Sequence, residues 1–300
     1  MSGQKIVIGT RGSNLALIQA QIAANALSAV EPGLDVELKI ITPKGDRDKS
    51  TPIPLDTIGK GWFSQEIEQE LQDGVIDLAV HSLKDMLTDL PKGVIIGAYL
   101  KREDARDVLL TKDGRPMEEL REGAIIGTDS TRRQVQMLAL RPGAVMTSIR
   151  GNVPNRVQKL YEEDYDAVIL AAAGLIRLEL QDKITRYFEP HEMTPSPGQG
   201  TIALEVKTTN VPLIEILAKA NSKDAETASL LERTFSEVIG GGCKAPTGAY
   251  AWREAGIWNL IGMAQHQDGT ILRETISAQE TGSTEMGKQL AATILKRIGK

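Results

Sequence analysis

The stretch AVHSLKD, residues 79–85, places several chemically active groups directly after an apolar run. A buried strand normally ends in a turn of Gly, Asn or Pro. Here it ends in a ring that can exchange protons, a hydroxyl, a cation and a carboxylate: His81, Ser82, Lys84 and Asp85. This mixture is typical of a site that holds a charged ligand and stabilises charge or moves protons during a reaction.

Asp85 has two interpretations of equal weight when its sequence neighbours alone are considered. Beside Lys84 it can form a structural ion pair, or it can stabilise a cation that develops in a reaction and relay protons. A lone histidine such as His81 is more often a hydrogen-bonded scaffold residue than an acid or base. His191 and His266 lack the spacing of metal ligands, so no metal site is predicted.

The single cysteine, Cys243, follows the glycines at 240–242 and precedes Lys244. Glycines permit a close approach of the backbone, and a neighbouring lysine favours the thiolate. Three interpretations stay open: an incidental thiol, a covalent attachment point on a loop above a cleft, and the nucleophile of a thiol enzyme. The last has little support because no histidine is close in sequence. One cysteine also excludes an internal disulfide and suits a reducing compartment.

Short β-branched runs alternate with longer stretches of helical spacing over the first two hundred residues. This alternation predicts an α/β fold with mostly parallel sheets. The predicted strands are 6–8, 36–41, 76–80, 94–98, 124–127, 145–149 and 167–171. The predicted helices are 15–29, 65–73, 132–140 and 155–162. A further helix at 225–239, strand-like runs with a hairpin at Asp268-Gly269 and a helix at 284–298 predict a small α+β domain.

Basic and hydroxyl side chains follow five of the seven predicted strands, at the ends where α/β proteins bind ligands. Ser13 or Ser130 is expected to cap a helix whose N-terminus attracts anions. Arg132 and Arg133 in a first helical turn are explained if an anion binds between them. The alternative is a set of solvated or ion-paired surface arginines. No phosphate-loop or dinucleotide fingerprint is present, which favours a polycarboxylate over a nucleotide.

The whole-chain properties exclude several classes of protein. With 300 residues, 25% of them charged and 41% apolar, the chain is long enough for two or three domains with cores. A net charge of −5 argues against binding to nucleic acid or to acidic membranes. The first strand-like run begins at Lys5, so we expect no signal peptide and a cytoplasmic protein. The acidic charge favours a monomer.

Several motifs in order resemble those of the porphobilinogen deaminase (hydroxymethylbilane synthase) family. They are GTRGSNLAL (9–17), GKGWF (59–63), AVHSLKD (79–85), IGTDSTRRQ (126–134), IRGNV (149–153), AAAGLIRL (171–178), PGQG (197–200) and GGGCKAPTGAYA (240–251). The resemblance runs nearly from end to end, and the combination of motifs is far more specific than any one of them.

The resemblance implies two lobes like those of periplasmic binding proteins and a small α+β domain. It places the first lobe at 1–100 and 199–219, the second at 101–198 and the last, which carries the cofactor cysteine, at 220–300. It also implies a dipyrromethane cofactor joined to Cys243 by a thioether. On this primer a transferase of tetrapyrrole and haem biosynthesis joins four porphobilinogen molecules, releases ammonia and finally forms hydroxymethylbilane.

The family positions assign a role to each candidate residue. Asp85 is catalytic, because a carboxylate stabilises positive charge on the pyrrole nitrogens. Besides Cys243, the cofactor-binding positions are Ser82, Lys84, Thr128, Ser130, Arg132, Arg133 and Arg156. The substrate-binding positions are Arg11, Ser13, Lys60, Arg150 and Arg177.

The chain departs from the family pattern at a few places, and one other class of protein stays in view. Met86-Leu87 replace a usual Val-Pro, and Asp129 replaces a common serine beside Arg132. Asn14 and Pro197 are further departures. The alternative class is a non-catalytic anion-binding module, such as a solute-binding or sensor protein, which would bind its ligand reversibly and carry no covalent group.

Overall fold

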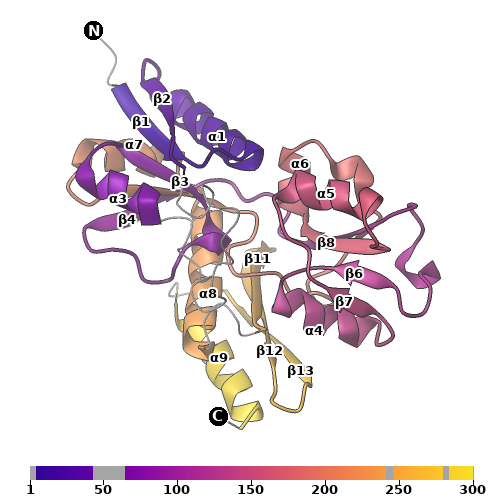
Figure 1. Cartoon of the computed structure of the whole chain (residues 1–300). Coiled ribbons are helices and arrows are strands. Elements are labelled where there is room, and N and C mark those ends of the chain that lie inside the picture. The colour runs from indigo at the N-terminus through magenta and orange to yellow at the C-terminus, as the bar shows by residue number, and fades with distance from the viewer. Residues whose placement is uncertain (1–4, 43–64, 241–245, 280–283, 300) are drawn as a thin grey trace. The chain divides into compact units, whose positions relative to one another are not determined.

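The computed structural model describes residues 5–42, 65–240, 246–279 and 284–299, which contain three β-sheets (Figure 1). By its internal contacts the chain separates into two compact units, 1–102 with 201–226 and 103–200 with 227–300. The boundary between the units falls inside one helix, α8 (Lys223–Ile239). The predicted fold class is confirmed. The division into three domains with the bounds given above stays a prediction.

The first unit is built on a five-stranded sheet with the strand order β2-β1-β3-β10-β4. Strand β1 pairs in parallel with β2 and β3, whereas β10 is antiparallel to both β3 and β4. The strands are β1 (Lys5–Thr10), β2 (Asp35–Ile40), β3 (Leu78–Ser82), β4 (Val94–Tyr99) and β10 (Ile202–Lys207).

Helices cover both faces of this sheet, so its strands are apolar on both sides. Helices α1 (Asn14–Val30) and α7 (Val211–Ala220) share one buried cluster with β1, β3 and β10, which includes Leu27, Leu204 and Leu217. Helix α3 (Gln65–Asp73) contributes Ile67 and Leu71 to a cluster on the other face. Figure 1 shows α1 running beside β1 and β2.

A second five-stranded sheet lies in the other unit, with the order β7-β6-β8-β5-β9. Its strands are β5 (Asp107–Thr111), β6 (Ile125–Gly127), β7 (Val145–Thr147), β8 (Ala167–Ala171) and β9 (Arg186–Tyr187). Strand β6 is parallel to β7 and β8, and β5 is antiparallel to β8 and β9. The helices are α4 (Thr131–Leu140), α5 (Val153–Glu162) and α6 (Ala172–Arg177).

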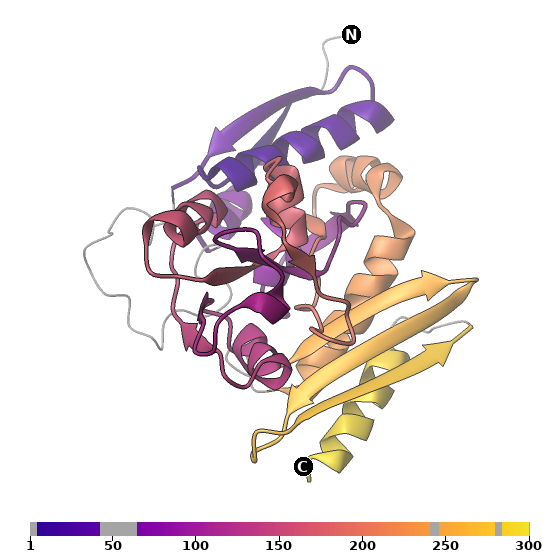
Figure 2. The same cartoon turned by 90° about the vertical axis from the view of Figure 1, so that its right-hand side faces the viewer.

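The same unit contains a three-stranded antiparallel sheet, β11 (Gly248–Glu254), β12 (Ile257–Gln265) and β13 (Ile271–Ala278). Helices α8 and α9 (Glu285–Arg297) pack on one face of it through a cluster that includes Phe235, Leu260 and Leu290. Figure 2 shows this sheet with α9 behind it. The hairpin expected at Asp268-Gly269 joins β12 to β13.

The structure corrects the prediction of mostly parallel sheets. Both five-stranded sheets are mixed, because β10 and β5 each enter a sheet antiparallel to two neighbours. Neither strand was predicted. The second lobe was expected to begin at 101, and the boundary between the compact units falls at 102–103. The charged run that starts there ends in Asp107, which is the first residue of β5 and is fully buried. A charge at that position needs buried counter-charges, which lie in a distant helix.

Candidate functional site

The end of β3 orders two of the predicted polar residues within the protein itself. His81 is buried, and its Nε2 lies 3.2 Å from Oε2 of Glu205 in β10. The Ser82 hydroxyl accepts a hydrogen bond from Nε2 of Gln19 in α1 at 2.8 Å. His81 is therefore part of the scaffold, in agreement with its more common role. Ser82 fixes the junction between β3 and α1.

Asp85 faces solvent at the end of a single 3-10 turn, Leu83–Asp85. Leu83 is buried and its backbone N–H donates to the carbonyl of Thr201 at 3.0 Å, so the turn is anchored from inside. The Asp85 carboxylate accepts no hydrogen bond from any residue that the structure describes. Lys84, half-buried, precedes it. This arrangement leaves a carboxylate available to N–H donors of a ligand.

The end of β1 leads directly into α1. The Ser13 hydroxyl oxygen accepts the backbone N–H of Ala16 at 3.3 Å and caps the helix, as predicted. A hydroxyl that accepts at a cap retains its own O–H as a donor for a ligand. Arg11 is half-buried just before the cap. Lys60 and Cys243 lie outside the described residues.

The anion between Arg132 and Arg133 is a carboxylate of the protein. Asp107 Oδ2 lies 2.6 Å from Nη1 of Arg132, and Asp107 Oδ1 lies 2.7 Å from Nη2 and 3.0 Å from Nε of Arg133. Asp107 is 0% exposed, Arg132 6% and Arg133 7%. The sequence interpretation assigned this place to an external anion. Full burial of two guanidinium groups in the first turn requires an internal counter-charge.

One positive charge is left over in this cluster, which we call the Asp107 triad (Asp107, Arg132 and Arg133). Burial alone raises the pKa of the Asp107 carboxyl, but the two guanidinium groups outweigh it and hold the pKa well below its usual value. Arg133 uses its remaining Nη1 on the carbonyl of Ile169 at 3.2 Å. Nε and Nη2 of Arg132 have no hydrogen-bond partner among the described residues. The triad can therefore offer one net charge and two donor nitrogens to an anion.

Hydroxyl groups surround the same helix start. The Ser130 hydroxyl accepts the backbone N–H of Arg133 at 3.4 Å and caps α4 as predicted, and Thr128 Oγ1 accepts the N–H of Ser130 at 3.2 Å. Asp129, the departure from the family pattern, is exposed and hydrogen-bonded to the Ser148 hydroxyl. Its carboxylate is thus engaged away from the triad.

Three further arginines follow β7 and β8. Arg150 is exposed and makes no hydrogen bond to a described residue. Nε of Arg156 donates to the Gly151 carbonyl at 2.8 Å, and Nη2 of Arg177 donates to the Gly200 carbonyl at 2.6 Å. Burial lowers the pKa of the Arg177 guanidinium, and Glu103 opposes that change. Arg150 is thus open to ligand, whereas Arg177 is partly committed to the backbone.

Comparison with known proteins adds independent evidence. Residues 6–215 match the family model described as porphobilinogen deaminase, dipyromethane cofactor binding domain, and residues 226–296 match that of its C-terminal domain. A porphobilinogen deaminase of Syntrophotalea carbinolica is 42% identical and covers 99% of this chain and 94% of its own. One of Clostridioides difficile is 40% identical and covers 97% of each chain. The chain belongs to the porphobilinogen deaminase family.

The sequence prediction of a porphobilinogen deaminase, a transferase of tetrapyrrole biosynthesis with a dipyrromethane cofactor, is confirmed at the level of the family. Among solved structures, the methionine-binding protein MetQ has a TM-score of 0.46 and 11% identity, and covers 74% of this chain and 92% of its own. The two porphobilinogen deaminase family models that match this chain together span both of its compact units.

Sequence reasoning missed the buried carboxylates that support these porphobilinogen deaminase motifs. Asp107 also accepts from Nε2 of Gln199 in the PGQG motif at 3.0 Å. Glu232 in α8 accepts the N–H groups of Gly198 and Ala251, both at 2.7 Å. No local signal in the sequence marked them, because Asp107 ends the charged run 101–107 and Glu232 stands beside Arg233, both typical of surface positions.

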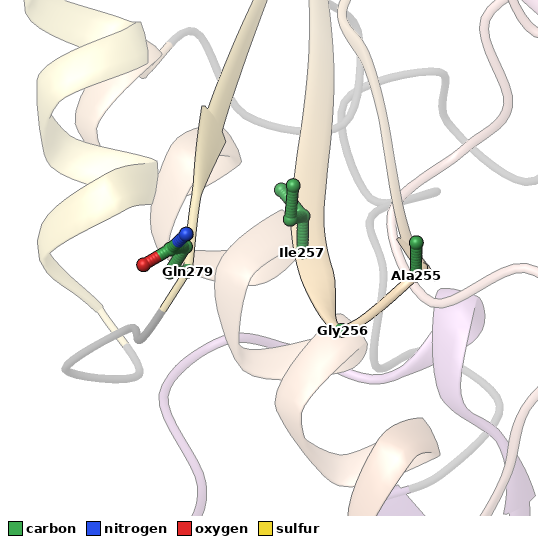
Figure 3. A pocket seen from close by; sticks show the side chains of 4 residues that line it. All are labelled: Ala255, Gly256, Ile257 and Gln279. Carbon is green, nitrogen blue, oxygen red and sulfur yellow. The ribbon is translucent and has the colours of Figure 1, made fainter.

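A shallow pocket at the β11–β12 hairpin lies in a different part of the chain. Ala255, Gly256, Ile257 and Gln279 line it, and none of these side chains is titratable (Figure 3). It contains none of the predicted site residues. Over the described ranges, no group of His, Cys, Asp and Glu is arranged to hold a metal ion. Nor does any described helix meet the length and hydropathy required to cross a bilayer.

Proposed function

We propose that the cations at the strand ends of this chain hold the carboxylates of a growing pyrrole chain while Asp85 stabilises positive pyrrole nitrogens. Bound through Cys243, the dipyrromethane group supplies the primer to which porphobilinogen units are joined. Each pyrrole carries an acetate and a propionate, so the reaction requires several cationic donors. The observation that carries the proposal is the exposed carboxylate of Asp85. It accepts no hydrogen bond from a described residue and lies directly after Lys84 in the chain.

The second unit supports the cofactor role through its donor set. The Asp107 triad has one surplus positive charge, with Arg132 Nε and Nη2 available, and the Ser130 hydroxyl can donate at the same helix start. Thr128 supports Ser130, and Arg156 follows in α5. These groups fit an acyclic polycarboxylate. Arg150 and Arg177 are proposed to bind the carboxylates of incoming porphobilinogen.

The first unit supplies the reacting carboxylate. Loss of ammonia from porphobilinogen leaves an electrophile whose pyrrole nitrogen carries positive charge, and Asp85 stabilises that charge and takes part in proton transfer. Lys84 and Ser82 are proposed to bind the cofactor beside it, and Arg11, Ser13 and Lys60 the substrate. Replacement of His81 is expected to affect stability more than chemistry, because its partner is the buried Glu205.

Asp85→Ala tests the catalytic assignment. Loss of one preorganised electrostatic partner costs about a hundred- to a thousandfold in kcat, and we expect a larger loss because every condensation uses Asp85. The control is Asp89→Ala, which removes another exposed carboxylate nearby. Steady-state assays with porphobilinogen should show parental kcat for the control. An Asp85→Ala variant that retains parental kcat would exclude the catalytic role.

The intact mass of the denatured protein, compared with a Cys243→Ser variant, tests the cofactor attachment. We expect an excess equal to two linked pyrrole units in the parent and its absence from the variant. A parent with the bare chain mass is then incubated with porphobilinogen. Failure to gain mass would contradict the proposal and favour the reversible anion-binding module.

The oligomeric state and the location of the enzyme are also proposals. We propose a cytoplasmic monomer, from the acidic net charge of −5 and the single cysteine. Light scattering coupled to gel filtration should give a mass near 32.5 kDa. A concentration-dependent dimer mass would contradict the monomer.

A further inference from the structure

Thr194 links the Asp107 triad to the rest of its unit. This residue is fully buried, and its carbonyl accepts Nη1 of Arg132 at 2.6 Å. Its backbone N–H donates to Oε1 of Gln136 at 2.8 Å. The direction in which the Arg132 guanidinium points therefore depends on where the backbone at Thr194 lies.

Gln136 in α4 has every hydrogen-bonding position in use. Its Nε2 donates to the carbonyls of Arg132 at 3.2 Å and Thr194 at 3.1 Å. Its Oε1 accepts from Thr194 and also from Nη2 of Arg273 in β13 at 2.9 Å. A fully buried amide with four hydrogen bonds to three residues has a single orientation, so it transmits the position of Arg273 to Thr194.

Arg273 is unusual because only neutral groups hold it. Its Nη2 also donates to the Glu192 carbonyl at 2.7 Å, and no carboxylate pairs with it within the described residues. Burial lowers the pKa of its guanidinium. An apolar side chain of similar size would avoid the desolvation cost of this cation, so stability alone does not explain the arginine.

The C-terminal sheet also contacts the same segment through its backbone. Ala249 N–H in β11 donates to the Pro195 carbonyl at 3.0 Å. A Cβ atom added to Gly248 would lie 2.7 Å from the Thr194 carbonyl oxygen. The segment at Thr194 and Pro195 is thus held by β11 through the backbone and by β13 through Arg273.

We propose that Arg273 is a positioning residue, which acts through Gln136 and Thr194 to hold Arg132 in the orientation that the pyrrole chain requires. This inference rests on the proposed role of Arg132 in binding the cofactor. The hydrogen bonds of Arg273 go to Gln136 and to the Glu192 carbonyl, so in this proposal it acts through other residues. It aligns the triad with the sheet whose first strand, β11, follows Cys243 along the chain.

Arg273→Met in the holoenzyme tests this inference. If the Arg132 guanidinium is displaced, the pyrrole carboxylate that it binds moves with it and the reacting atoms are misaligned. We therefore expect kcat to fall about tenfold while KM for porphobilinogen changes less than about twofold. Labelling of Arg132 by phenylglyoxal, mapped on peptides, should become faster. Arg273→Lys keeps a donor for Gln136 and should restore most of kcat. Gln136→Met breaks the same hydrogen-bonded link at Gln136 and should give the same fall in kcat and the same faster labelling of Arg132. It replaces Arg273→Met in the test if that variant does not fold.

Arg297→Met is the matched control. Arg297 lies in α9 of the same C-terminal region and pairs with Glu274, so the variant removes one cation without touching α4. We expect parental kcat and parental Arg132 labelling. Equal losses in both variants, or no change in Arg273→Met, would overturn the positioning role.

Arg132→Lys separates the two hypotheses. If Arg132→Lys lowers kcat but Arg273→Met does not, only the positioning role fails. If Arg132→Lys leaves kcat unchanged, the proposed function of Arg132 fails. In the double variant, Arg132→Lys with Arg273→Met, we expect kcat to fall by less than the product of the two single falls, because both changes act on the Arg132 guanidinium.

Discussion

At the scale of single residues, Asp107 determines how much charge the arginine pair presents. Removing one partner of a buried ion pair leaves an uncompensated charge. We expect Asp107→Asn to lower the free energy of unfolding at neutral pH by about 3–5 kcal/mol. Asp113→Asn is the control, because its ion pair with Arg115 is exposed to solvent and should contribute little to stability. Urea unfolding measures both, and equal effects would contradict the assignment.

The same residue predicts a pH dependence. In the folded state the Asp107 pKa is held below the ordinary value of 3.8. As the pH falls below 3.8, Asp107 binds a proton in the unfolded chain before it does so in the folded protein. The stabilisation from ionised Asp107 is therefore complete above pH 3.8 and is lost as the pH falls toward the folded-state pKa. The stability difference between parent and Asp107→Asn should therefore shrink from neutral pH toward pH about 2. A difference that is constant with pH would show that Asp107 is not ionised in the folded protein.

At the scale of elements, Gly248 sets how closely β11 approaches the segment after Met193. Its missing Cβ would lie 2.7 Å from the Thr194 carbonyl and 2.9 Å from that of Pro195, and backbone atoms cannot rotate away. We expect Gly248→Ala to destabilise the protein by about 1–3 kcal/mol and to lower kcat as Arg273→Met does. Gly256→Ala is the control, since its φ of +83° strains the backbone but no atom lies within 4 Å of the new Cβ. Its kcat should be parental.

The sequence predicted those elements whose signal is local. Helices α1, α4 and α9 have the predicted apolar spacing, and Ser13 and Ser130 cap α1 and α4 as expected. Strand β10 was missed because Glu205 interrupts its apolar run, and that carboxylate is buried only because His81 lies across the sheet. Strand β5 was missed because its first residue, Asp107, ends a charged run, and the two arginines that neutralise it lie far along the chain in α4.

The candidate site followed the same rule. The carboxyl ends of parallel strands β1, β3, β6 and β8 were located by the basic residues after them, which is a local pattern. The supports were not visible in the sequence, because Asp107, Gln199 and Glu232 contact residues far along the chain. Contacts between residues so far apart in the chain depend on the fold and cannot be read from a local sequence motif.

At the scale of the whole molecule, the net charge of −5 opposes an anionic substrate, whereas the strand ends attract it. Two opposite salt effects are therefore conceivable. If the overall charge dominates, salt screens repulsion and lowers KM for porphobilinogen. If exposed cations such as Arg150 dominate, salt screens attraction and raises KM. The buried triad contributes little to the difference, because solvent ions screen buried charges weakly.

The exposure of Arg150 favours the second effect. Between about 0.01 M and 0.15 M salt the screening length falls from about 30 Å to about 8 Å. Over this range we expect KM to rise severalfold and kcat to change little, since the carboxylates are bound in both the ground and transition states. Arg150→Gln should reduce the salt dependence, whereas Lys159→Gln should not, because Lys159 is already paired with Glu163. A KM that falls with salt would mean that the overall negative field, and no local cation, governs substrate capture.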